Sequence, residues 1–508
     1  MEMFFRRLEI LALGAVLLLW QSSMAWSRTI TVDDDGPADF QRVQDAVDAA
    51  VYGDEVVIFP GIYSDVRTRV LTLRFPPGWL GGSTVEAEVT ALVFLKDGVK
   101  LRGLAREEVV LDAQGRGTVV FGTEVGPATS VEEVTIQGGI SNQYEHPFLG
   151  RMGGGIMLFN AAPVISRNII RANTAVEFGG GIEVAFSYGI ARLERNEVTN
   201  NSVSVGGGGI DIVNSDPIVE GNLIVGNRAG AGSGGGIAVY DLFGVEFKPG
   251  LVMNTVARNE ASAGGGIALV GGGLVGWPTQ VMGNIVYANI ASGNKRGGGI
   301  LISDAVAGIS FNNVFSNEGG NYAGGKDRDL TGIGGNISAD PLFANPDAGD
   351  WRLTRDSPSI DAVPVELFMA GKELFGFATR DLEGNARPLD GDSDSEAVLD
   401  MGAFEFNRGS ILDLRIKQDR ETLVWRAEAG GLLYNIYRGL FEGLQTGLFG
   451  TCLGSVDATV AGSEFGDPQE PEAGEGFIYL VTQQTSEGEQ SLGFSREGLE
   501  RVNAAPCP

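Results

Sequence analysis

A cluster of glycines followed by isoleucine recurs six times between Gly153 and Asn317. The isoleucines are 26, 28, 27, 30 and 33 residues apart. Repetition at this period is typical of solenoids, in which each repeat buries its apolar side against its neighbours. We therefore expect a stack of equivalent coils. The six isoleucines are Ile156, Ile182, Ile210, Ile237, Ile267 and Ile300.

Each repeat also contains two asparagines five positions apart. The residues three before and two after the first asparagine are apolar in every copy, which is period-2 alternation typical of short β-strands. Asparagines in register on neighbouring coils can form a hydrogen-bonded ladder. Glycines suit corners that need positive φ or close backbone approach, and no helix follows them as a phosphate loop would require. The expected ladder residues are Asn168, Asn196, Asn222, Asn254, Asn284 and Asn312.

The combined pattern, Gly-Gly-Ile followed by the two asparagines, resembles the secreted right-handed parallel β-helix proteins of the pectin-lyase-like superfamily. Residues 29–63, from Thr-Ile-Thr-Val to Gly-Ile-Tyr, and residues 340–406, ending in Asp-Met-Gly-Ala-Phe-Glu-Phe, match it too. The resemblance implies an all-β fold, with a right-handed parallel β-helix over residues 26–406. It implies no single activity, because this superfamily holds lyases, hydrolases, esterases and adhesins. The Gly-His-Gly of polygalacturonases is absent from the sequence.

The first 25 residues have the pattern of a secretory signal peptide. Arg6 and Arg7 precede an apolar stretch at residues 10–20, and Ser23-Met24-Ala25 supplies a small-residue cleavage site. The alternative, a membrane anchor, is disfavoured because eleven apolar residues are too short to span about 30 Å of hydrocarbon. We expect export to the cell surface or the medium, with the periplasm as an alternative, and no transmembrane segment in the mature chain.

Residues 39–50 are predicted to form an amphipathic helix that caps the open end of the solenoid. The formal net charge of −28 disfavours nucleic acid as a partner. It also disfavours polyanionic ligands, unless a local basic groove or bridging cations overcome the repulsion.

Glu183 and Asp211 directly follow the corner isoleucines of two adjacent repeats. Their side chains should point outward, about one strand spacing of 4.8 Å apart. Two such carboxyl groups raise each other's pKa and are the candidate catalytic acid and base, or a cation site. The alternative is a solvated acidic pair without function.

A second acidic group closes the β-helix. Asp390, Asp392, Asp394 and Asp400 alternate with small residues and are candidate ligands for Ca²⁺, which prefers six or more oxygens. The alternative is a hydrated acidic loop. If bound, the ion would brace the C-terminal end of the β-helix.

The repeats stop after Asn407. Residues 407–508 contain alternating segments without glycine corners, which predicts a small antiparallel β-sandwich. The spacing from Trp425 to Tyr434-Asn-Ile-Tyr-Arg438 is similar to that of fibronectin type III-like modules. Cys452 and Cys507 are the only cysteines, and in an exported chain we expect them to form a disulfide.

Three functions fit these features. The first is recognition of a polysaccharide or another extended polymer outside the cell, which rests on the resemblance. The second is a polysaccharide lyase or glycoside hydrolase that uses Glu183 and Asp211. The third is a structural or adhesive surface protein without catalysis.

Overall fold

The computed structural model describes most of the chain from residue 27 onward. The described residues are 27–76, 82–143, 150–242, 247–271, 279–303, 305, 307–324, 329–367, 378–391, 396–406, 412–416, 421–426, 433–440, 451–457, 463–469, 477–485, 488–489 and 507. The predicted signal peptide therefore lies outside them. No helix in these ranges is long and apolar enough to cross a membrane.

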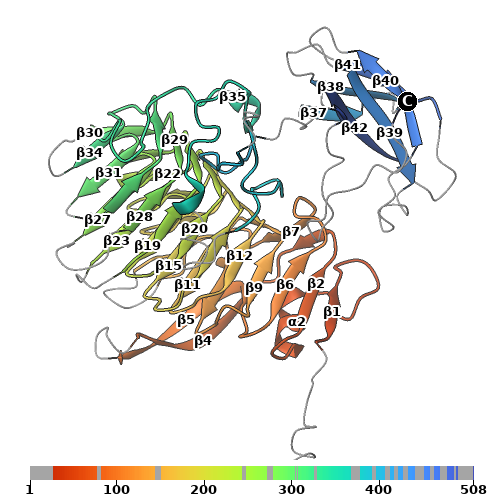
Figure 1. Ribbon diagram of the computed structural model, residues 1–508. Coiled ribbons are helices and arrows are strands. Elements are labelled where there is room, and N and C mark those ends of the chain that lie inside the picture. Colours follow the sequence, from red (N-terminus) through yellow and green to blue (C-terminus); the bar gives the residue numbers. More distant parts are fainter. Residues whose placement is uncertain are drawn as a thin grey trace, which may run out of the picture.

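The repeats form a parallel β-helix with four sheets, which we name A to D (Figure 1). Sheet A contains β1 (Thr29–Val32), β2 (Glu55–Ile58), β6 (Lys100–Gly103), β9 (Ser130–Glu132), β12 (Val164–Ser166), β16 (Arg192–Glu194), β20 (Ile218–Glu220), β24 (Gly250–Val252), β28 (Thr279–Met282) and β32 (Ala307–Ser310). Sheet B contains β3 (Gly61–Tyr63), β7 (Val109–Asp112), β10 (Thr135–Gln137), β13 (Ile169–Arg171), β17 (Glu197–Thr199), β21 (Leu223–Val225), β25 (Thr255–Ala257), β29 (Ile285–Tyr287) and β33 (Asn313–Phe315).

The two remaining sheets complete each coil. Sheet C contains β4 (Arg67–Arg74), β5 (Thr84–Phe94), β8 (Thr118–Thr123), β11 (Ile156–Phe159), β15 (Ile182–Ala185), β19 (Ile210–Val213), β23 (Ile237–Asp241), β27 (Ile267–Gly271), β31 (Ile300–Ser303) and β34 (Tyr322–Gly324). Sheet D is shorter, with β14 (Thr174–Ala175), β18 (Ser202–Val203), β22 (Arg228–Ser233), β26 (Glu260–Ala263) and β30 (Ile290–Arg296). The predicted all-β parallel β-helix is thus confirmed.

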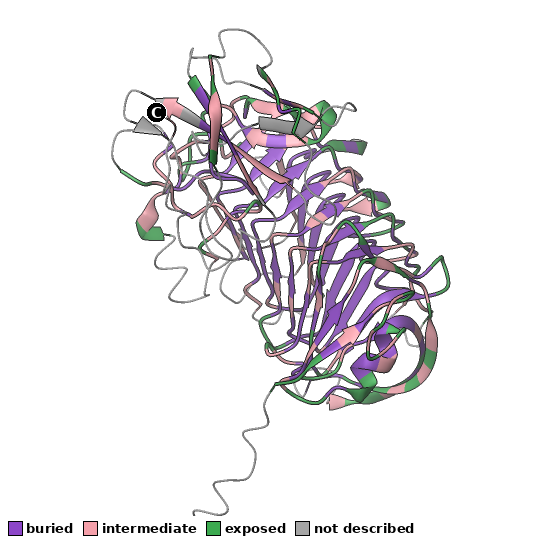
Figure 2. Cartoon of the chain, turned by 90° about the vertical axis from the view of Figure 1, so that its right-hand side faces the viewer, coloured by how far each residue is buried: buried purple, intermediate pink, exposed green. Residues whose placement is uncertain are grey.

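One face of every strand fills the interior of the coil stack. Ile182 and Val184 of β15 pair in register with Ile210 and Ile212 of β19, and all four are fully buried. Figure 2 shows buried residues running through the stack. Because the side-chain period of a strand is two, the residues between them, such as Glu183, project to the outer face of the sheet.

The predicted asparagines stack along the inside of the turn between sheets A and B. Asn196 donates from Nδ2 to Oδ1 of Asn222 at 3.0 Å and to the Ile165 carbonyl of the preceding coil at 2.8 Å. Its backbone N–H also donates to Asn222 Oδ1, at 2.8 Å. The stack continues to Asn336, beyond the last predicted member. The second asparagine of each repeat forms a parallel ladder of the same kind.

The glycine corners have a specific steric cause. Gly207 has a φ of 61°, and a Cβ there would lie 2.4 Å from Cβ of Asp211. At Gly208 a Cβ would lie 2.4 Å from the Gly235 carbonyl of the next coil. The corner therefore excludes larger side chains and brings neighbouring backbones close together.

A helix and a hairpin complete the N-terminal end. Helix α2 (Val43–Ala49) lies within the predicted helical range and buries Val43, Ala46 and Val47 against the first coils. Strands β4 and β5 pair antiparallel and leave the stack as a hairpin (Figure 1).

The chain after the last coil folds back over sheets A and B. It forms β35 (Phe343–Asn345), a short 3-10 helix η2 (Pro346–Ala348) and β36 (Asp350–Leu353). Leu399, Met401 and Phe406 then pack against outward-facing residues of sheet A, including Ile218 and Val252. A buried ion pair between Arg387 and Glu405, with 2.6 Å between Nε and Oε1, lies in this segment.

The C-terminal strands form two small antiparallel sheets. One contains β37 (Leu412–Ile416), β38 (Thr422–Arg426) and β41 (Ser463–Gly466). The other contains β39 (Leu433–Leu440), β40 (Thr451–Asp457), β42 (Phe477–Thr485) and β43 (Gly488–Glu489). Cys452 and Cys507 form the expected disulfide.

Replacement of Cys507 by serine should destabilise the C-terminal sheets. The bridge closes a loop with a sequence separation of 55 residues, so its loss should cost about 2–4 kcal/mol through the greater entropy of the unfolded chain. Thermal unfolding followed by Trp425 fluorescence would measure this. An unchanged unfolding midpoint would show that the disulfide does not stabilise these strands.

Candidate functional site

Glu183 and Asp211 are register partners on β15 and β19, as the repeat spacing predicts. They project to the outer face of sheet C, where Met157 and Ala238 occupy the equivalent positions on the flanking coils. Both acidic side chains are nevertheless fully buried. The alternative of a solvated surface pair is therefore wrong, because the outer face of sheet C is covered here.

Among the described residues, no group outside the pair offers these carboxyl groups a hydrogen bond. The two side chains interact with each other. Burial raises the pKa of Asp211 to about 8, and burial together with the neighbouring Asp211 raises the pKa of Glu183 well above its usual value. Two adjacent buried carboxylates cannot both remain charged at neutral pH, so we infer that the pair retains protons there.

Aromatic side chains lie beside the acid pair. Tyr240 contacts Phe178 edge-to-face with 5.7 Å between ring centroids, and burial, followed by the nearby Asp211 and Glu183, raises the pKa of its hydroxyl group. The outer face of sheet C also carries an apolar cluster with Phe75, Phe159 and Phe186. A polymer could reach the acid pair only if this cover opened.

The predicted calcium ligands are only partly described. Asp392 and Asp394 lie outside the described residues, and Asp390 is partly exposed. Asp400 is buried, and its two oxygens accept backbone N–H groups of Asp361 and Phe406. Asp400 therefore holds a turn of the chain together, and calcium binding remains a prediction.

The described residues contain one group of three carboxylates close enough to share an ion, Asp33, Asp34 and Asp35. Asp33 accepts N–H groups of its own turn and Asp34 accepts that of Ile62. Asp33 and Asp34 therefore stabilise turns of the chain through these contacts.

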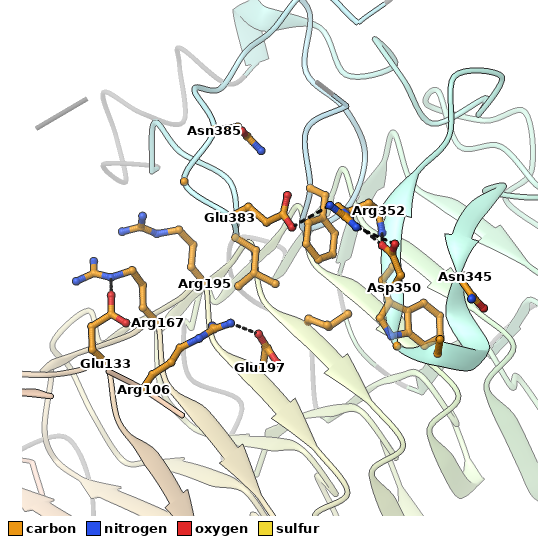
Figure 3. A pocket seen from close by; sticks show the side chains of 17 residues that line it. Arg106, Glu133, Arg167, Arg195, Glu197, Asn345, Asp350, Arg352, Glu383 and Asn385 are labelled. Atoms are coloured by element: carbon orange, nitrogen blue, oxygen red, sulfur yellow. Dashed lines mark hydrogen bonds and ion pairs between the residues drawn. The ribbon is translucent and has the colours of Figure 1, made fainter. Parts of the chain in front are cut away.

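An open groove lies on the outer face of sheet B and has a volume of about 1140 Å³ (Figure 3). One wall is the stack of coils and the other is formed by residues 345–352 and 382–385. Trp351, Phe404 and Leu223 belong to one apolar cluster in this region. The charged lining residues are Arg106, Glu133, Arg167, Arg195, Glu197, Asp350, Arg352 and Glu383.

Arg167 and Arg195 occupy the same position on consecutive coils. Each directly precedes a ladder asparagine and has positive φ, 56° and 53° respectively. The residue at this position on the preceding coil is Glu133, and on the following coil it is Gly221. Four successive turns between sheets A and B therefore carry, in order along the groove, one acidic residue, two basic residues and one glycine without a side chain.

Three of the four groove arginines have carboxylate partners. Arg106 pairs with Glu197, Arg167 with Glu132 and Glu133, and Arg352 with Asp350. Arg195 makes no hydrogen bond or ion pair with any described residue, and its Nε is buried without an acceptor. Burial, followed by the positive charge of Arg167, lowers the pKa of Arg195.

Buried acids hold the second wall in place. Glu220 of β20 accepts the Ala378 N–H with both oxygens, at 2.8 and 2.9 Å, and burial raises its pKa to about 7. Asp381 accepts the backbone and side-chain N–H groups of Asn385. The loop that carries Glu383 is thus fixed against sheet A.

The sequence did not predict this groove. Its second wall comes from residues more than a hundred positions beyond Arg195, and no repeat pattern links them. One local signal was present: Arg167-Asn168 and Arg195-Asn196 place two arginines one repeat apart, at a turn position that points outward.

One comparison with known proteins supports the fold. The family model for the right-handed β-helix region matches residues 115–276. The fold is therefore a right-handed parallel β-helix. No curated protein matches the chain.

Three solved structures illustrate the similarity. Pectate lyase Pel9A is 13% identical, with a TM-score of 0.35 over 76% of this chain and 98% of the enzyme. A pectin methylesterase mutant in complex with a hexasaccharide is 12% identical, with a TM-score of 0.23 over 64% and 98%. Pectin methylesterase PemA from Erwinia chrysanthemi is 10% identical, with a TM-score of 0.23 over 66% and 99%. At these identities and TM-scores the similarity carries neither an activity nor a substrate over to this chain.

Proposed function

We propose that this protein recognises an extended polymer, a polysaccharide in particular, in the groove on sheet B. The observation that carries the proposal is the shape and lining of that groove. Arg106, Glu133, Arg167, Arg195 and Leu223 come from five successive coils, so the groove extends about 19 Å along the solenoid at about 4.8 Å per coil.

The lining suits a sugar chain. Charged and amide side chains along both walls can donate and accept hydrogen bonds, and the apolar cluster around Trp351 gives the groove a partly apolar surface. Binding sites commonly combine apolar surface with a small number of placed polar groups. Paired arginines and carboxylates are held in place before a ligand arrives, which reduces the entropy lost on binding.

Polysaccharide cleavage by Glu183 and Asp211 is the second candidate function. It is supported by two fully buried, unsatisfied carboxyl groups, because perturbed acids without a structural partner are common at catalytic sites. It requires that the cover over sheet C open.

We further propose that the chain is exported and that residues 407–508 form a fibronectin type III-like sandwich. The signal-peptide pattern and the Cys452–Cys507 disulfide support export. The two antiparallel sheets and the buried Trp425 and Tyr434 support the sandwich.

The groove can be tested by filling it. Ala348 is exposed on η2 and lines the groove, so Ala348→Trp should obstruct it without disturbing the core. We expect wild-type protein to co-sediment with at least one polymer in a panel of neutral and acidic polysaccharides, and Ala348→Trp to lose at least about tenfold in affinity.

Ala49→Trp is the matched control, since Ala49 is exposed on helix α2 at the N-terminal end. The control should bind like wild type. Equal binding by wild type and Ala348→Trp would place the site elsewhere, and failure of wild type to bind any polymer would overturn the proposal.

A further inference from the structure

We propose that Arg195 is an anion-binding residue of the groove, and that the polymer recognised there carries carboxylate or sulfate groups. This inference rests on the proposed function and specifies the ligand's chemistry.

The first support is the position of Arg195 in the coil stack. Arg167, one coil earlier, is held by Glu132 and Glu133. The equivalent position one coil after Arg195 is Gly221, which has no side chain to offer. A Cβ added to Gly221 would meet a single group within 4 Å, Cγ of Arg195 itself at 3.6 Å. Open space therefore adjoins the unpaired arginine.

The second support is that nearby carboxylates are already engaged. Glu194 pairs with Arg192. Glu220 accepts the Ala378 N–H and lies 3.6 Å from Arg192 Nη2. Glu197 pairs with Arg106, with 2.5 Å between Glu197 Oε1 and Arg106 Nη2. Glu132, Glu194 and Glu220 attract the charge of Arg195, but no described acid forms an ion pair or hydrogen bond with it, so an external anion would complete its coordination.

The chemistry of the side chain defines the ligand group. A guanidinium group presents a planar set of N–H donors that matches two oxygens of a carboxylate or a sulfate. The overall charge of −28 repels polyanions, so binding of an acidic chain depends on a local cation with no internal partner. Arg195 is such a cation within a groove long enough for a polymer.

The test compares Arg195→Gln with Arg228→Gln in the full-length mature protein. Arg228 is the control because it is an exposed arginine of sheet D that does not line the groove and that pairs with Glu260. The probes are polygalacturonate, dextran sulfate and neutral dextran, measured by calorimetry at low salt. We expect one of the charged polymers to bind more tightly than dextran, and Arg195→Gln to weaken that binding about 10- to 100-fold.

Arg195→Lys keeps the charge but loses the fork geometry, so its affinity should fall between those of wild type and Arg195→Gln. The preferred charged polymer identifies the anion as carboxylate or sulfate. Equal affinity of Arg195→Gln and wild type, or binding of dextran alone, would overturn the anion assignment while leaving polymer recognition intact.

If no polymer binds, the proposed polymer recognition is wrong. Small anions then test whether Arg195 binds anions. Galacturonate or sodium sulfate should then raise the melting temperature of wild type and Arg228→Gln, but not that of Arg195→Gln, relative to galactose or sodium chloride. The absence of any such difference would overturn the anion site.

Discussion

Replacement of Glu183 by glutamine and Asp211 by asparagine will stabilise the protein at alkaline pH. Both pKa values are raised by burial, to about 8 for Asp211, so the folded protein keeps protons that the unfolded chain releases above about pH 4. The free energy of unfolding should therefore fall as pH rises above about 4, and the contribution of Asp211 should level off near pH 8. The slope is about 1.4 kcal/mol per pH unit for each retained proton.

The amide variant removes this contribution because its side chains do not titrate. The difference in the free energy of unfolding between this variant and wild type should be small near pH 4. It should grow to several kcal/mol near pH 8, at about 1.4 kcal/mol per pH unit for each retained proton. Urea unfolding at a series of pH values measures both profiles. Glu124→Gln is the control, since Glu124 is half-exposed. Parallel profiles for wild type and the amide variant would show that the pair is ionised in the folded protein.

The double amide variant also distinguishes polysaccharide cleavage at the acid pair on sheet C from polymer binding in the groove on sheet B. If the protein cleaves a polysaccharide with these acids, new reducing ends or unsaturated products will disappear in the amide variant. If it only binds through the groove on sheet B, polymer affinity will be unchanged while stability increases.

Replacement of Asn222 by alanine will destabilise the β-helix strongly. Asn222 Oδ1 accepts two N–H groups of Asn196, and its Nδ2 donates to the Leu193 carbonyl and to Asn254. The substitution leaves several fully buried polar groups without partners, at about 1–3 kcal/mol each, so we expect a loss of at least about 3 kcal/mol.

Asn345→Ala is the control for the ladder, because Asn345 is exposed and makes no side-chain cap bond to η2. Its midpoint in urea should stay close to that of wild type. A similar small effect at Asn222 would mean that water or relaxed neighbours replace the ladder bonds.

The sequence repeat predicted most of the fold because each coil imposes the same steric and hydrogen-bonding requirements on the residues within it. Gly180, Gly208 and their equivalents are required where one coil touches the next, and Asn196 is required where a buried turn needs both a donor and an acceptor. These requirements recur in every coil, so they are visible as a period in the sequence. The adjacency of Glu183 and Asp211 followed from the same period.

Burial of that pair and the groove did not follow from the period. The cover over sheet C includes Phe75 of the β4–β5 hairpin, and this hairpin and the wall at residues 382–385 are non-repeating segments. Their docking depends on particular contacts, such as Glu220 with the Ala378 N–H, which a single sequence does not reveal. The boundaries at residues 26 and 407 likewise remain predictions.

Hydrogen exchange with and without a bound polysaccharide tests the location of the site most directly. If the groove on sheet B is the binding site, amides of residues 345–353 and 382–385 and of strands β17 and β21 will exchange more slowly in the complex. Exchange in β15 and β19, which carry Glu183 and Asp211, will stay the same. Protection confined to β15 and β19 would contradict the proposed site and assign binding to the outer face of sheet C.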